Sequence, residues 1–298
     1  RLVAAEAAAF FRVGPGATGI TGGLSFALLG AGHLIGLSAG MAILAGVVVG
    51  WWIVLPILTA ANPMPGDVAT WANTVFRNDV RFFGAGVIGV AAIWTLLRIA
   101  KPVIGGLAAS LAQSRGRGET VALEERDLPF PIVAGATLAL LVPIAFLLHG
   151  VVAGGPLAGA ELLLVASSLL FVLVIGLVIA AVCGYMAGLI GASNSPVSGI
   201  GILAVIAASL MLVGWFGRGG DADQTQALVA YALIVTGIVF GVATISNDNL
   251  QDLKTGQLVG ATPWKQQVAL VIGVCFGSIV VPPVLQLLYT SFGFAEIG

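Results

Sequence analysis

The chain has 298 residues and a formal net charge of −1 at pH 7, with 59% hydrophobic and only 8% charged side chains. This composition lies outside that of soluble globular domains and is typical of a polytopic membrane protein. The small net charge gives no sign of nucleic-acid binding, and we expect no nucleic-acid partner. Cys183 and Cys275 both lie in apolar runs, which argues against a disulfide framework or a zinc site.

The first third of the chain has room for three crossings. His33 is the only ionisable side chain between residues 12 and 67, which predicts two crossings joined by a glycine-rich turn at residues 36–40. The polar stretch 67–79 carries Trp71 and predicts a short amphipathic helix in the interface. A third crossing begins near Arg81 and ends in a polar loop over residues 114–127.

The next helix is expected to follow Pro129 and Pro131 and to reach about His149, with a kink at Pro143. No charged side chain then occurs between Glu161 and Arg218. At about 1.5 Å per residue this run exceeds twice the hydrocarbon thickness of about 30 Å, so the chain must cross, break and return. The break is expected at GASNSPVSG, residues 191–199.

Two further helices are predicted at residues 227–246 and 266–288, the second interrupted by Pro282-Pro283. The sequence therefore predicts an all-α polytopic transmembrane bundle of about eight crossings, with broken or re-entrant segments. We expect residues 1–298 to form one transmembrane domain. Lysine and arginine collect in alternate loops, which places residues 114–127, the break and a loop at 247–264 on the cytoplasmic side.

The break is the first candidate site. In lipid, unpaired backbone is tolerated only inside protein or beside a water-filled cavity, and many secondary carriers build their substrate sites from discontinuous helices. A plain connecting turn is the alternative, and Tyr185 could be a simple anchor. The candidate substrate-binding residues are Tyr185, Ser193, Asn194, Ser195, Pro196, Ser198 and Gly199.

The second candidate site follows residue 246. Asp248 and Asp252 share one face if the helix continues, with Asn249 nearby, and paired carboxylates at a membrane boundary can carry a proton or hold a cation. A solvated cytoplasmic loop neutralised by Lys254 is the alternative. His33 is a weaker coupling candidate because it titrates near neutral pH, and a packing histidine is its alternative.

No nucleophile–base pair or metal-ligand cluster stands out, so we expect neither an enzyme nor a bound cofactor or metal. A helix broken by glycines and proline favours a carrier that changes conformation over a static channel. A passive pore for small solutes and a structural membrane scaffold are the alternatives.

Two long segments carry a family resemblance. They are GYMAGLIGASNSPVSGIGI at 184–202 and NDNLQDLKTGQLVGATPWKQQ at 247–267. Both resemble the oligopeptide transporter family, in particular its bacterial branch, to which the plant yellow-stripe metal-chelate transporters are related. The chain departs from many members in having Asn194-Ser195-Pro196 for Asn-Pro and Gln257 for tyrosine.

The resemblance implies a multi-pass protein of the cell inner membrane that takes up small peptides or peptide-like metal chelates. It also implies proton coupling, so the expected partners are the substrate, protons and the lipid bilayer, with a homodimer left open. Because family members are considerably longer, we expect this chain to be part of a longer transporter.

Overall fold

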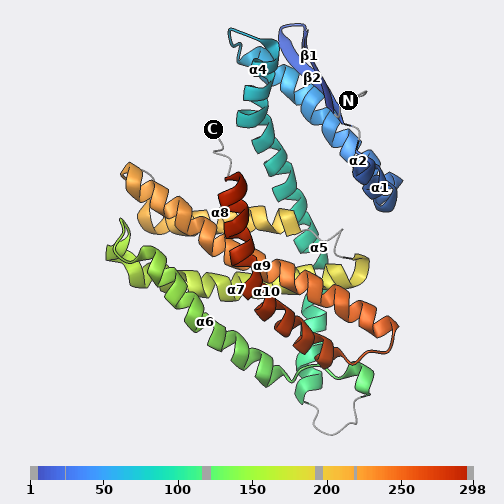
Figure 1. Cartoon of the computed structure of the whole chain (residues 1–298), viewed down its shortest axis with the longest axis vertical. Helices are drawn as coiled ribbons and strands as arrows, with labels where there is room; N and C mark the ends of the chain where they lie inside the picture. The colour runs from blue at the N-terminus through green and yellow to red at the C-terminus, as the bar shows by residue number, and fades with distance from the viewer. Residues whose placement is uncertain (1–5, 24, 116–121, 192–196, 218–219, 294–298) are drawn as a thin grey trace. The chain divides into compact units, whose positions relative to one another are not determined.

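The structure is a computed structural model that describes residues 6–23, 25–115, 122–191, 197–217 and 220–293 (Figure 1). The chain divides into two compact units, Arg1–Val90 and Ala91–Gly298. Seven helices in the described part of the chain are long and apolar enough to cross a membrane. The predicted all-α polytopic architecture is confirmed, and the difference from about eight crossings lies at the N-terminal end.

The first unit begins with a β-hairpin that the sequence analysis did not predict. Strands β1 (Glu6–Val13) and β2 (Gly16–Gly23) pair antiparallel around Gly14, whose φ is +57°. Helix α1 (Phe26–Ile35) has ten residues, about 15 Å, which is half the thickness of a bilayer core. The expected crossing before Gly36 is therefore wrong, because its first half forms strands. The turn at Gly36 is confirmed by a φ of +86° between α1 and α2.

The rest of this unit is helical. Helix α2 (Leu37–Val47), a π-helical stretch (Val48–Val54) and α3 (Leu55–Ala61) make one continuous span. The predicted helix at residues 67–79 begins as α4 (Val68–Val75), capped by Asp67 and with Trp71 buried, but it is not a separate short helix because it continues toward the next helix. A second π-helical stretch (Phe76–Val80) leads into α5 (Arg81–Arg115).

The second unit holds α6 (Phe130–Val152), α7 (Glu161–Ile190), α8 (Val197–Phe216), α9 (Ala222–Leu258) and α10 (Pro263–Phe292). The helix predicted after Pro129 is confirmed, and Pro143 lies within it. The start of the break predicted at residues 191–199 is confirmed, because α7 ends at Ile190 and Gly191 has a φ of +84°. Its predicted end is wrong, since α8 already begins at Val197, and residues 192–196 lie outside the described residues.

Three further predicted boundaries are wrong. Helix α9 continues to Leu258, so most of the predicted loop at 247–264 is helix; no glycine or proline occurs between residues 242 and 255 to end it. Helix α10 runs through Pro282 and Pro283 without interruption, although each proline removes a backbone hydrogen bond and crowds the preceding turn. Helix α5 extends to Arg115, into the expected polar loop.

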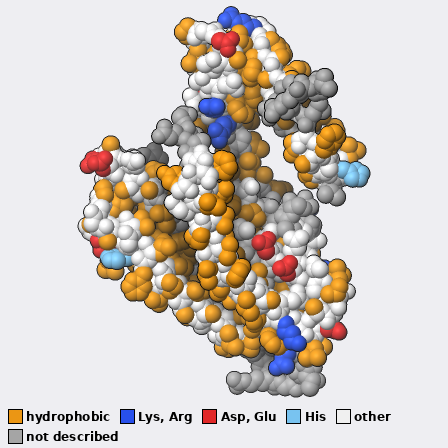
Figure 2. Space-filling view, viewed as in Figure 1, with side chains coloured by type: hydrophobic (Ala, Val, Ile, Leu, Met, Phe, Trp, Pro, Cys, Tyr) orange, Lys and Arg blue, Asp and Glu red, His pale blue; other side chains and the backbone are white. Residues whose placement is uncertain are grey.

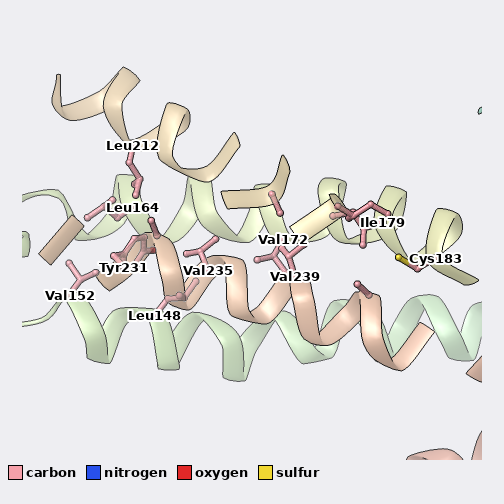
Figure 3. Close-up of a cluster of buried hydrophobic side chains, with 14 of the residues drawn as sticks. Leu148, Val152, Leu164, Val172, Ile179, Cys183, Leu212, Tyr231, Val235 and Val239 are labelled. Atoms are coloured by element: carbon pink, nitrogen blue, oxygen red, sulfur yellow. The ribbon is translucent and has the colours of Figure 1, made fainter. Parts of the chain in front are cut away.

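The core of the second unit lies between α7 and α9, which run parallel and side by side. Apolar residues from these helices and from α6 and α8 fill it, among them Leu148, Leu164, Val172, Leu212 and Val235 (Figure 3). Tyr231 is fully buried, and its hydroxyl donates to Ser168 Oγ at 3.0 Å. Many large hydrophobic side chains are exposed, and the face drawn in Figure 2 carries hydrophobic patches with few charges, as expected of a surface that meets lipid.

Candidate functional site

Three helices converge where α7 ends. Gly184 in α7 faces α9 so closely that an added Cβ would lie 2.8 Å from Ser246 Oγ and 3.0 Å from Leu250 Cδ2. Ser246 Oγ donates to the backbone oxygen of Ala180 at 2.6 Å, across the same contact. Near the start of α8, Gly201 packs against the ring of Phe240. We call this meeting point of residues 180–188, 197–201 and 240–250 the three-helix junction.

A buried polar group that has no partner among the described residues lies at the junction. Asn247 is 6% exposed, and its side-chain oxygen Oδ1 has no hydrogen-bond partner among the described residues. Burying an unpaired acceptor costs about 1–3 kcal/mol, so such groups are uncommon in folded proteins. Asn247 is therefore held where its oxygen could accept a hydrogen bond from another molecule.

A cavity of about 470 Å³ opens beside the junction, and we call it the acidic basin. Three carboxylates, one ammonium, one amide and several small or apolar residues line it: Glu124, Glu125, Asp127, Gly188, Leu250, Leu253, Lys254, Gln257 and Pro263. The basin joins the two segments that the sequence analysis singled out, since Gly188 comes from the first and Lys254 from the second. Its charge balance favours cationic or zwitterionic ligands.

Hydrogen bonds fix the wall of the basin to the first turns of α10. Gln267 Oε1 accepts from the backbone N–H of Leu128 at 3.0 Å, and Gln267 Nε2 donates to Asp127 Oδ1 at 3.1 Å. The N–H of Trp264 donates to the backbone oxygen of Arg126 at 3.1 Å. The segment that carries the carboxylates is thus held in place by side-chain and main-chain bonds together.

The predicted substrate-binding residues divide into two groups. Ser193, Asn194, Ser195 and Pro196 lie outside the described residues. Tyr185 is half-buried on α7, next to Gly184, while Ser198 is exposed and Gly199 is buried in the first turn of α8. The three described members therefore lie in the segments that form the three-helix junction.

The predicted coupling residues do not line the basin. Asp248, Asn249 and Asp252 are helical, as the conditional prediction required, and both aspartates are exposed. At about 3.6 residues per turn, the two carboxylates lie on the side of α9 opposite Leu250 and Lys254. His33 is exposed on α1, in the first unit. Their part in coupling stays a prediction.

The sequence analysis missed the residues that the structure brings together. Asn247 was part of a quoted segment but not a candidate, and Glu124, Glu125 and Asp127 were assigned to a polar loop. One signal was available: these three acidic residues lie within four positions of one another in that loop. No three histidine, cysteine, aspartate or glutamate side chains come together as metal ligands within the described residues.

A multi-pass helical membrane protein is the class that these features define, with seven apolar helices of spanning length in the described chain and a polar cavity beside a helix break. The chain belongs to the OPT oligopeptide transporter protein family, whose model matches residues 3–296. The family resemblance of the sequence analysis is thereby confirmed, and the chain's relatives are transporters, not enzymes.

Named relatives support the assignment. A protein of Haemophilus influenzae, named as a candidate oligopeptide transporter, is 43% identical over 99% of this chain and 48% of its own length. Two rice proteins, the probable metal-nicotianamine transporters YSL10 and YSL12, are 32% and 35% identical over 26% and 28% of the chain, and over 11% of their own length. No solved structure matches. The chain thus spans about half the length of the bacterial relative.

Proposed function

We propose that this chain is part of a secondary active carrier of the cell inner membrane that takes up small peptides or peptide-like metal chelates together with protons. Membership of the OPT family supports the transport class, and the names of the bacterial and rice relatives supply the two substrate classes. Within that carrier, residues 1–298 act as one transmembrane domain, with the segment 114–127 on the cytoplasmic side.

One observation carries the proposal for this part of the chain. The break between α7 and α8 lies at the three-helix junction, and the acidic basin opens beside it. In a membrane protein, irregular backbone next to a polar cavity is where secondary carriers hold their substrates. A static pore needs a lined channel, whereas a helix break next to a closed, partly apolar core favours a site whose walls move.

The charges of the basin fit a peptide. Glu124, Glu125 and Asp127 offer carboxylates to an amino terminus, and Lys254 offers an ammonium to a carboxyl terminus. Lys254 Nζ at present donates to Gln257 Oε1 at 2.8 Å, an exposed contact that a stronger acceptor can replace. A cavity of about 470 Å³ is large enough for a short peptide and too small for a folded one.

Uptake into proteoliposomes tests the proposal. Wild-type protein should accumulate labelled peptide or metal chelate only when an inward proton gradient is imposed, and a protonophore should abolish the accumulation. The variants Asn194→Ala and Asp248→Asn test the break and the predicted coupling carboxylate, with circular dichroism as the control for folding. Wild-type uptake in both variants would remove those two residues from the site.

Equal flux with and without the gradient would point instead to a passive pore. The homodimer left open by the sequence stays a prediction, and the mass of the detergent-solubilised protein, measured by light scattering, tests it.

A further inference from the structure

We infer that Asn247 is a substrate-binding residue whose side-chain oxygen accepts a hydrogen bond from an N–H group of the transported molecule. The inference rests on the proposed transport function and deepens it, because it names the group of the substrate that is recognised. The junction, the basin and the chemistry of a carboxamide each supply one step.

The first step is the contrast with other buried polar groups of the same helix bundle. Thr236 Oγ1 donates to the backbone oxygen of Ala232 at 2.7 Å, and Tyr231 donates to Ser168. Both hydroxyls therefore have partners inside the protein. Asn247 is 6% exposed, yet its Oδ1 accepts nothing from the described residues, so its bonding capacity is available to a ligand.

The second step is the position of Asn247 relative to the basin. Leu250 follows Asn247 by three residues, about one helical turn, so the two lie on neighbouring parts of one face of α9. Leu250 lines the basin, and its side chain also packs against Gly184 of α7. Asn247 itself does not line the basin, so a ligand would reach its oxygen only if the Leu250 side chain moved aside. Gly188, on the α7 side, lines the basin without a side chain.

The third step is the chemistry of the ligand. A carboxamide oxygen is a neutral acceptor, suited to amide N–H and ammonium donors. This oxygen is therefore matched to an N–H donor of the transported molecule. Peptides and peptide-like chelates share N–H groups, and one acceptor can serve both.

The experiment compares two ligands and three proteins. The ligands are labelled trialanine and trialanine methylated on both amide nitrogens, which removes the donors. The proteins are the wild type, Asn247→Leu and, as the matched control, Thr236→Val, which removes a buried polar group that already has a partner. Binding is measured in detergent and initial uptake in proteoliposomes.

Methylation should weaken binding to the wild type and to Thr236→Val by about tenfold, the worth of one good hydrogen bond. Asn247→Leu should bind trialanine about tenfold more weakly than the wild type, and methylation should then cost it little more. An equal methylation effect in Asn247→Leu and the wild type would overturn the inference.

Thermal melting separates a ligand role from a packing role. Because Oδ1 has no partner in the described chain, Asn247→Leu should melt at the wild-type temperature or above it. A clearly lower melting temperature, in this variant and in Asn247→Ser alike, would show a structural hydrogen bond and overturn the inference. A wild type that neither binds nor takes up trialanine would contradict the proposed function as well, whereas normal wild-type binding with unaffected Asn247 variants would contradict the inference alone.

Discussion

Helices α9 and α10 are alike in length and apolar character but differ in what surrounds them. In α9, 33% of the most apolar stretch is buried inside the protein, whereas in α10 no residue is buried by the described chain. Helix α9 contains a buried tyrosine, threonine and asparagine, whereas the buried polar atom of α10 in the described chain is Gln266 Nε2, in the first turn of that helix. Hydropathy therefore identifies a membrane crossing, while buried polar residues identify the crossing that packs against protein.

Truncating one large side chain in the packed core and one on α10 tests this difference most directly. Leu164 in α7 is fully buried in the core (0% exposed), whereas Leu285 in α10 is 49% exposed. Leu164→Ala should destabilise the protein by about 2–5 kcal/mol, because it leaves a cavity in a packed core. Leu285→Ala should change the melting temperature little, since lipid or detergent fills the space. Equal losses in the two variants would mean that α10 has a packed face after all.

A smaller effect is expected from crowding the contact between α7 and α9. Gly184→Val should cost about 1–3 kcal/mol by overpacking, since even a Cβ at Gly184 would meet Ser246 and Leu250. Gly273→Val on α10 is the matched control, because no described atom lies within 4 Å of a Cβ there. Melting temperatures of both variants in detergent measure the difference, and a control that melts as low as Gly184→Val would contradict the prediction.

The smallest effect concerns the buried hydrogen bond of α9. Tyr231→Phe removes the donor to Ser168 and should cost about 1 kcal/mol, because the buried serine loses its partner. Adding Ser168→Ala should recover part of that loss, whereas the exposed Ser278→Ala on α10 should have no effect. A double variant less stable than Tyr231→Phe alone would argue against the bond as the cause.

The crossings of the second unit were predictable because apolar runs and prolines mark them. Pro129 and Pro131 marked the start of α6, and Gly191 marked the end of α7. The end of α9 was mistaken because polar residues such as Asn247 and Asp248 were taken as a loop signal. Polar side chains do not by themselves end a helix, and α9 ends at Leu258, two residues before Gly260, whose φ is +71°.

The N-terminal hairpin and the acidic basin were harder to predict. The sequence Gly14-Pro15-Gly16 is a turn signal, but the apolar residues on both sides of it are equally compatible with a membrane-spanning helix. The basin depends on tertiary contacts between residues more than 130 positions apart, such as Asp127 with Gln267, a separation of 140. Spacing within one helix carries no information about such pairs.

The hydrogen bonds between α10 and the segment 126–128 have a mechanical consequence. Gln267 and Trp264 fasten that segment to the first turns of α10, so the two move as one piece. Beyond its first turns helix α10 is largely exposed, so we expect a sliding or tilting of this helix to be passed to Asp127 through these bonds. Bilayer thickness and lateral pressure, which act on such a helix, thereby become forces on the rim of the cavity.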